Sequence, residues 1–370
     1  MTIKDRAQLD ASIDRFRRGF WNREAMDRPP FGVLPDRAWL PLLYLRGPLR
    51  ASEFQPADIG PELARSDYED AAEHRTVTLD DWMPWAAPWR GVPWLEAIAG
   101  CSVLAAQGSL APGAWADSIE QMRDLTEPRG KGWFDRLGVL TAELEAAAPD
   151  DCFVSTSIYR GPSDVLAAAR GLTNFYLDLA DEPETVAEAA LAVNQMHLAV
   201  LARHFSIVKP RLGGYGHIYG FWSPEPTTMI QDDVLGMTSP ATFRDYFSAC
   251  AAEIVSHLGS RVMYHLHSTG FGHWRHLLDI PGLAGVELTV EPIGPSLHDL
   301  APILREIAER SRLLLMVDSH FDEFVDVVGK LPTDGVYVGV SDKYVRNNDE
   351  YLELLSATWP RAKDRPTTRR

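Results

Sequence analysis

Strand and helix patterns alternate through the second half of this chain, and this alternation restricts its fold more than any other feature. Short apolar runs rich in β-branched residues predict strands at 261–266, 285–290, 313–317 and 336–340. The segments that follow them predict helices at 272–278, 297–310, 323–328 and 349–357. Such alternation is typical of a parallel sheet with crossover helices. At 370 residues the leading fold is α/β, a TIM (β/α)8 barrel, and a doubly wound open sheet is the second choice.

The first half of the chain is less regular. Residues 5–25 predict an amphipathic helix, 31–34 a first strand, and 153–158 a strand that runs into polar residues. Between residues 80 and 94 four indoles alternate with prolines: Trp82, Trp85, Trp89 and Trp94. This segment is either a pocket wall that presents aromatic faces to a ligand or a long loop anchored to the body by its indoles. We expect one barrel domain over 1–360, with a helical, tryptophan-rich extension over about 1–115 and a short basic tail at 361–370.

Composition argues against several classes of protein. The net charge of -16 argues against a nucleic-acid partner, which would need a basic face. Cys101, Cys152 and Cys250 are too far apart for a zinc ribbon or a disulfide framework, so we expect a reducing, cytoplasmic compartment. No apolar stretch reaches the length of a membrane span, and the glycines of 211–220 lack the strand-then-helix context of a nucleotide-binding fingerprint. A homodimer is expected only from the frequency of such assemblies.

Two histidines close the strand predicted at 261–266. His265 and His267 are two residues apart, so on a strand their side chains point to the same face. A Ser-Thr-Gly turn then ends the strand abruptly. A single histidine in this place would most simply be a partly buried structural residue. A same-face pair at the end of a strand favours a functional role instead.

Ionisable side chains also follow the other predicted strands. In a TIM barrel the chemistry lies where the strands end. The residues that we expect to line a site with the two histidines are Tyr159, Arg160, His217, Tyr219, Asp232, Asp233, Glu287 and Glu291. The tryptophan-rich segment adds Asp81, Trp82 and Trp85 as candidate substrate-binding residues. The simpler alternative is that positions near loops are polar because they are solvated, which explains Asp342 better than it explains His265.

Three kinds of chemistry fit this set of residues. The first is a site for zinc or another divalent metal, with the ligands His265, His267, Glu287 and Glu291. The second is general acid–base catalysis by the same histidines with Glu291 and Asp233. The third is anion binding by Arg160, helped by the N-terminus of the helix predicted after residue 162. A Ser-His-Asp triad is disfavoured, because no Gly-x-Ser-x-Gly elbow is present.

Several motifs, taken in order, resemble the uroporphyrinogen decarboxylase superfamily. They are Asp-Arg-x-Pro at 27–30, Tyr-Arg-Gly-Pro at 159–162, Asp-Asp at 232–233, Thr-Ser-Pro at 238–240, His-Leu-His-Ser-Thr-Gly at 265–270 and Thr-Val-Glu-Pro at 289–292. The resemblance spans most of the chain and implies a TIM barrel with its site at the C-terminal face. It implies an activity from one of the family's branches. These are the decarboxylases, the cobalamin-dependent methyltransferases that act on corrinoid proteins, and, more distantly, cobalamin-independent methionine synthase.

The chain also departs from the family's motifs. The methyltransferases hold zinc with a His-x-Cys pair and a later Cys, whereas here the pair reads His267-Ser268-Thr269 and no cysteine follows Cys250. A sulfur-ligated zinc site of that kind is excluded. A harder nitrogen and oxygen site stays open, because His267 and Glu291 are spaced like the zinc ligands of the methionine synthases. The arginine-rich motif and the late Gly-His of true uroporphyrinogen decarboxylases are missing, and the early region has only the isolated Arg37, Arg46 and Arg50.

The sequence therefore predicts a barrel enzyme of the methyltransferase branch. It would act with a small methyl donor or a corrinoid protein and would use a metal or an acid–base site at the strand ends. The first alternative is a metal-free decarboxylase or lyase, with Asp81 or Asp233 as the acid. The second is a non-catalytic barrel that binds a ligand or a corrinoid protein.

Overall fold

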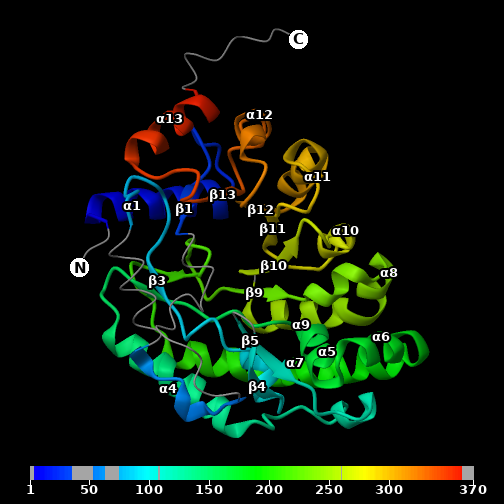
Figure 1. The fold of residues 1–370 in the computed structure, drawn as a ribbon. Coiled ribbons are helices and arrows are strands. Elements are labelled where there is room, and N and C mark those ends of the chain that lie inside the picture. The colour runs from blue at the N-terminus through cyan, green and yellow to red at the C-terminus, as the bar shows by residue number, and fades with distance from the viewer. Residues whose placement is uncertain (1–3, 36–52, 63–74, 107–108, 260, 361–370) are drawn as a thin grey trace.

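Six parallel strands form the central sheet of this mixed α/β protein (Figure 1). The computed structural model describes residues 4–35, 53–62, 75–106, 109–259 and 261–360, so Arg37, Arg46, Arg50 and the basic tail lie outside the described residues. The sheet has the order β1–β13–β12–β11–β10–β9. Its strands are β1 (Phe31–Leu34), β9 (Thr228–Gln231), β10 (Val262–His267), β11 (Gly285–Val290), β12 (Arg312–Val317) and β13 (Val336–Ser341). The parallel sheet predicted for the second half of the chain is confirmed.

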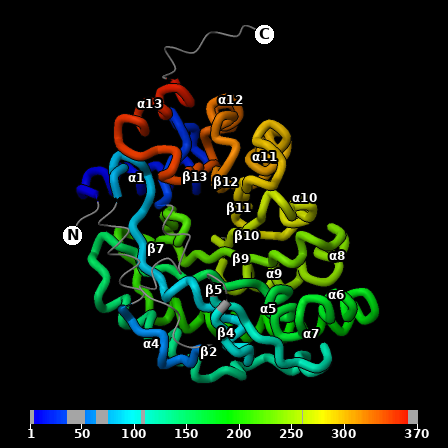
Figure 2. The backbone as a smooth tube through the Cα atoms, viewed as in Figure 1, coloured from blue at the N-terminus to red at the C-terminus, as the bar shows by residue number. Residues whose placement is uncertain are grey.

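Crossover helices connect these strands, as the alternation predicts. In Figure 2 the chain passes from β9 to β13 by way of helices outside the sheet. The crossover helices are α9 (Ser248–Leu258), α10 (Trp274–Leu277), α11 (Leu297–Arg310) and α12 (Phe324–Val328), and α13 (Asn348–Thr358) follows the last strand. In α11 the side chain of Ser296 caps the N-terminus, and Leu300, Leu304 and Ile307 form the buried stripe. Local sequence and packing thus agree on this helix.

The remaining α-helices of the described residues come before α9 in the chain. They are α1 (Arg6–Arg15), α3 (Trp94–Ile98), α4 (Lys131–Ala147), α5 (Pro162–Arg170), α6 (Leu172–Asp181), α7 (Pro183–Ile207) and α8 (Pro240–Thr242). Helix α7 is long and apolar enough to cross a membrane, but 61% of that apolar window is buried inside the protein, where the helix packs against α4, α5 and α9. The helix predicted at 5–25 is shorter, because α1 passes into a wider π turn at Phe16–Trp21 and then ends. A second π turn, at Phe243–Phe247, lies between α8 and α9.

Short strands form three smaller units. Strands β2 (Glu53–Phe54), β4 (Ser102–Ala106) and β5 (Ser109–Gly113) make an antiparallel sheet, and β7 (Tyr215–Gly216) pairs with β8 (Trp222–Ser223). Strands β3 (Trp85–Ala86) and β6 (Phe153–Val154) form a parallel pair. This pair lies next to both edges of the central sheet: Asp81 N–H donates to the Phe31 carbonyl over 2.8 Å, and Arg160 pairs with Gln231 in parallel. The strand predicted at 153–158 therefore has only two residues in a regular ladder.

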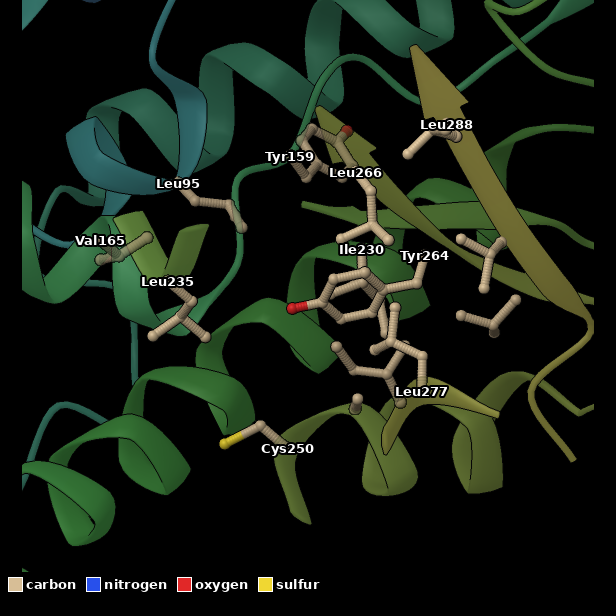
Figure 3. Packing of buried hydrophobic residues seen from close by; sticks show 14 of the residues in the cluster. Leu95, Tyr159, Val165, Ile230, Leu235, Cys250, Tyr264, Leu266, Leu277 and Leu288 are labelled. Atoms are coloured by element: carbon tan, nitrogen blue, oxygen red, sulfur yellow. The ribbon is translucent and has the colours of Figure 1, made fainter. Parts of the chain in front are cut away.

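Side chains alternate between two cores along each strand. From β10, Val262, Tyr264 and Leu266 pack with the helices, as Figure 3 shows for Tyr264 and Leu266. The intervening Met263 belongs to a second cluster on the other face of the sheet, which also contains Leu314, Met316, Tyr337 and the aromatic residues of the first helical segment, Phe16, Phe20 and Trp21. Period-two alternation thus places His265 and His267 on the inner face with Met263.

Candidate functional site

The two histidines of β10 lie in contact at the carboxyl ends of neighbouring strands. The register sets His265 beside Gln231 of β9 and Glu287 of β11. His265 is 4% exposed and His267 is about a third exposed at the side chain. Their Nε2 atoms are 3.1 Å apart. The prediction that the two side chains share a face is confirmed.

A carboxylate meets the Nδ1 atom of each imidazole. Glu287 contacts Nδ1 of His265 and is held in place by the Thr289 hydroxyl, 2.7 Å away. Glu291 Oε1 lies 3.0 Å from Nδ1 of His267, in ion-pair contact but without the alignment of a hydrogen bond. A carboxylate at Nδ1 favours the proton there and leaves the lone pair on Nε2. Both lone pairs therefore point toward the same place.

Two facing lone pairs at this distance repel each other unless a cation or a proton lies between them. Asp233 supplies a third donor, because its Oδ1 lies 3.5 Å from His267 Nε2. One ligand atom from each of Asp233, His265 and His267 lies within 4.8 Å of the others. The structure thus gathers a different donor set from the one predicted. Asp233 joins the two histidines, while Glu287 and Glu291 contact the far side of the imidazoles and orient them.

Acidic neighbours decide the charge of the site. Burial alone would lower the pKa of His267, but Asp233, Glu291 and Glu287 outweigh it and raise the pKa to about 9. Burial would raise the pKa of Asp233, and the hydrogen bond from His267 together with the charge of His265 lowers it below its usual value. In the protein without metal, a proton on His267 therefore balances part of the negative charge around the facing Nε2 atoms.

A network of side chains behind the site fixes the backbone that carries Asp233. Asp164, on the first turn of α5, accepts the N–H groups of Asp233 and Val234 over 3.1 and 2.9 Å. Asp232 in turn accepts the N–H and the hydroxyl of Ser163, at 3.0 and 2.5 Å, and the hydroxyl of Tyr264 at 2.9 Å. We call Ser163, Asp164 and Asp232 the β9 clamp. It joins the start of α5 to the end of β9 twice: Asp164 of α5 accepts N–H groups that follow β9, and Asp232 after β9 accepts the N–H and hydroxyl groups of Ser163 in α5.

The β9 clamp changes the interpretation of two predicted site residues. Asp232, expected to bind substrate, caps the N-terminus of α5 instead. That helix end therefore already has a carboxylate, and Arg160 forms an ion pair with the buried Glu96. The anion site predicted from Arg160 and this helix N-terminus is thus filled by groups of the protein itself.

Of the aromatic candidates, Tyr219 reaches the site. Its hydroxyl lies 3.1 Å from Nδ1 of His265. It stands on the turn between β7 and β8, which is held by a hydrogen bond of 3.0 Å from the Tyr337 hydroxyl to the Tyr219 carbonyl. His217 stacks on Tyr219, and burial lowers its pKa to about 3, so it is neutral. Tyr159 lies among the hydrophobic residues that pack against the helices (Figure 3), away from the cavity.

Asp81, Trp82 and Trp85 lie in a separate cluster of buried charge. Asp81 forms an ion pair with Arg28 and accepts the N–H of Phe31 over 2.9 Å. Guanidinium groups lie over both indoles, 4.2 Å from the ring centre at Trp82 and 4.8 Å at Trp85. These three residues are outside the described lining of the cavity, and their contacts are those of the anchored loop that was the alternative for this segment.

A cavity of about 450 Å³ opens at the histidines. Its described lining consists of Leu34, Ile158, Tyr219, Gln231, His265, His267, Thr289, Glu291, Pro292, Met316, Val317, Asp318, Gly339, Val340 and Ser341. Gln231 and Thr289 were not among the predicted site residues. Thr289 had a signal, since it is two residues beyond Glu287 on a predicted strand and so shares its face, whereas no strand was predicted around Gln231.

Comparison with known proteins gives the fold. No protein-family model matches the sequence, and no curated protein matches it. Among solved structures, a methyltransferase from Methanosarcina mazei has a similar fold, with a TM-score of 0.58 over 95% of this chain and 98% of that chain. The sequence identity is 15%, so the likeness defines the class of fold and does not extend to the reaction. The chain is an α/β protein with a methyltransferase-type fold.

Proposed function

We propose that this protein is a metal-dependent methyltransferase related to the uroporphyrinogen decarboxylase superfamily. The observation that carries the proposal is the convergence of His265 Nε2, His267 Nε2 and Asp233 Oδ1 at a cavity. Three protein donors beside an open cavity are typical of a catalytic rather than a structural metal site.

The fold expected for that superfamily is a closed barrel, and two sets of contacts support it. The β3–β6 pair supplies the two strands that the six-stranded sheet would need to become an eight-stranded barrel. The segment before β3 bonds to β1 through Asp81 and Phe31, and the segment after β6 bonds to β9 through Gly161 and Gln231. We propose that these contacts complete a barrel in which β1, β3, β6 and β9–β13 succeed one another. The cavity then lies at its C-terminal mouth, where barrels of this kind carry their sites.

The residues at the site fit a divalent metal such as zinc. Two imidazoles and one carboxylate are a common ligand set, and the absence of sulfur donors makes the site harder than one built for a thiolate. When bound, such a metal would act as a Lewis acid on a nitrogen or oxygen atom of the substrate. Glu287 and Glu291 hold the imidazoles in the orientation that directs Nε2 toward the cavity.

The cavity also constrains the partners of methyl transfer. At about 450 Å³ it has the size of a small-molecule pocket. A corrin macrocycle does not fit inside it. A corrinoid partner, if the reaction uses one, would keep its cofactor in its own protein and present it at the mouth of the cavity. No step proposed here depends on it.

The second candidate is a metal-free decarboxylase or lyase. It is favoured by one observation, the carboxylates that raise the pKa of His267 to about 9 and so keep this side chain protonated at neutral pH. A cationic imidazole in a cavity can donate a proton to a developing carbanion. In this second mechanism a proton on His267 takes the place of the metal ion of the metal-dependent mechanism.

Metal content distinguishes the two candidates. Purified wild-type protein would be compared by mass spectrometry with His267→Ala, and with His298→Ala as a control at an exposed histidine that also faces a carboxylate. We expect about one equivalent of divalent metal in wild type and in the control, and much less in His267→Ala. A wild-type protein without metal after reconstitution would exclude the metal-dependent reaction and leave the acid–base candidate.

A further inference from the structure

The cavity has two chemically different halves. Strands β9, β10 and β11 supply a polar half, made of Gln231, His265, His267, Thr289 and Glu291. The rest of the lining comes mainly from β1, β12, β13 and the segment after β6, where the side chains of Leu34 and Met316 belong to the inner hydrophobic cluster and Ile158 packs against it. A ligand atom at the two Nε2 atoms would therefore have the rest of its molecule against an apolar wall.

Two side chains of the apolar half are almost fully buried. Leu34 and Met316 are 3% and 6% exposed, and they belong to the inner hydrophobic cluster. Gly339 lies between them, and a Cβ atom at this position would overlap both side chains. The missing side chain thus lets Leu34 and Met316 meet across β13. A ligand whose apolar body packs against these side chains gains the free energy of removing its own apolar surface from water.

The polar half already has an excess of negative charge. Asp233, Glu287 and Glu291 surround two imidazoles that are neutral when they bind a metal. Three carboxylates against one divalent cation leave a net charge of -1 at a partly exposed site, where the side chains of His267, Asp233 and Glu291 are 28–35% exposed. Asp318, which also lines the cavity, is balanced by Lys343 at 2.6 Å. A second anion would be repelled by this surplus negative charge.

We infer that the substrate is a small, uncharged molecule with one metal-binding nitrogen or oxygen atom and an apolar body about the size of a phenyl ring. This inference rests on the proposed metal site and goes beyond it by naming the class of molecule. The polar half selects the uncharged donor atom, and the apolar half selects the body. A small carboxylate or phosphate ester is not a substrate of this site.

Four probes test the two requirements separately. They are imidazole, 4-phenylimidazole, acetate and phenylacetate, titrated by calorimetry into cobalt-loaded and into metal-free protein. The visible spectrum of cobalt reports whether each probe coordinates the metal. We expect 4-phenylimidazole to bind at least about tenfold more tightly than imidazole, because the phenyl ring covers the apolar half. We also expect it to bind at least about tenfold more tightly than phenylacetate, because the carboxylate meets the surplus negative charge.

Two variants make the test specific to this wall. Met316→Gln places an amide in the apolar half and should abolish most of the gain from the phenyl ring, while imidazole binds as in wild type. Met237→Gln is the matched control, since Met237 is 79% exposed and outside the described lining. It should leave all four affinities unchanged.

The outcomes separate this inference from the proposed function. Equal affinity of imidazole and 4-phenylimidazole, or equal affinity of phenylacetate and 4-phenylimidazole, in cobalt-loaded protein would overturn the inference and leave the metal site intact. Protein that binds no cobalt but still prefers 4-phenylimidazole would overturn the metal site and support the class of substrate. Protein that binds no cobalt and shows no preference for 4-phenylimidazole would overturn both the metal site and the class of substrate.

Discussion

Two clusters of buried charge in this protein use similar residues in opposite ways. The N-terminal ion cluster consists of Lys4, Arg28, Arg75, Asp80 and Asp81. Lys4 and Arg75 both pair with Asp80, and Arg28 pairs with Asp81. The N–H groups of Phe31 and Val33 donate to the same two carboxylates. Every carboxylate of this cluster meets a cation.

The site cluster, made of Asp233, His265, His267, Glu287 and Glu291, has no such balance. Its cationic partners are imidazoles, and each Nδ1 already faces a carboxylate. The two Nε2 atoms face each other and Asp233. The comparison separates buried charges that serve the structure from those that could bind a ligand. In the N-terminal ion cluster every carboxylate pairs with a fixed cation, whereas the site cluster keeps a surplus of carboxylates that the proposed metal would balance.

The largest expected effect comes from breaking the N-terminal ion cluster. Asp80→Asn leaves Lys4 and Arg75 buried with one negative partner fewer, so we expect the free energy of unfolding to fall by about 3–5 kcal/mol. The Asp80 and Lys4 side chains have no exposed surface, so solvent does not screen this pair. Urea unfolding followed by circular dichroism and by tryptophan fluorescence measures the loss.

Two controls belong to that measurement. Asp10→Asn removes an exposed partner of Arg6 and should cost less than about 1 kcal/mol. Asp233→Asn, in metal-free protein, should also cost less than about 1 kcal/mol, because Asp233 and His267 are each about a third exposed and solvent screens their contact. A loss as large as that of Asp80→Asn would mean that the site cluster is a structural network of the same kind.

Metal should stabilise the protein through the site cluster, and this effect should not depend on the N-terminal ion cluster. Zinc at 100 times its dissociation constant should raise the free energy of unfolding by about 2.7 kcal/mol. The gain should vanish in His265→Ala and persist in Asp80→Asn, because only the first variant removes a donor. A chelator should reverse it. An equal gain in His265→Ala would place the metal elsewhere on the protein.

A variant of Asp164 measures how much the β9 clamp contributes to positioning the site cluster. Asp164 contacts no proposed ligand atom, but it accepts the backbone N–H groups that position Asp233. Asp164→Ala should therefore weaken metal binding by about 10–100-fold, equivalent to about 1.4–2.7 kcal/mol. The amide hydrogens of residues 233 and 234 should also exchange faster, whether or not metal is present.

A matched variant for Asp164 lies on the neighbouring helix. Asp178→Ala removes a carboxylate that pairs with Arg170, away from the cavity. It should change neither metal affinity nor exchange at 233 and 234. Unchanged exchange in Asp164→Ala would show that the β9 clamp is not what fixes this backbone.

The sequence predicted the parts of the fold and site that depend on local periodicity. The strand predicted at 285–290 and the helix predicted at 297–310 have the bounds of β11 and α11. His265 and His267 share a face because the period of a strand is two. The alternation of strands and helices likewise predicted the parallel sheet. Each of these inferences needs only neighbours along the chain.

The sequence could not predict which polar groups meet across the fold. Asp81 finds its partner Arg28 at a separation of 53 residues, which no local pattern reports. Glu287 and Glu291 were expected as ligands, but whether they face the metal side or the Nδ1 side of an imidazole depends on side-chain torsions. Tyr159 faces the outer core because the side chain direction flips with each residue of an extended segment. Tertiary geometry, which the sequence does not report, therefore decides which of the predicted site residues contact one another.

Helix α7 offers a third kind of buried group, an imidazole with no partner. His197 is fully buried and has no hydrogen bond to any described residue, and burial lowers its pKa to about 3. In the unfolded chain its pKa is about 6.5. The unfolded state therefore binds a proton below pH 6.5 that the native state refuses, so stability falls as the pH drops from 6.5 toward 3. At pH 5.5 the loss from this one group is about 1.4 kcal/mol.

Replacing this imidazole sharpens the comparison, since His267 is only partly buried and has carboxylates that raise its pKa. His197→Phe keeps a ring against Tyr159 and removes the titration. The quantity to compare is the change in unfolding free energy between pH 7.5 and pH 5.5, which should be about 1.4 kcal/mol smaller in the variant than in wild type. His298→Phe, at an exposed position, should leave that change as it is. An identical acid dependence in His197→Phe would mean that His197 has a hydrogen-bonding or charged partner in solution. His197 would then not differ in kind from the ionisable residues of the other two clusters.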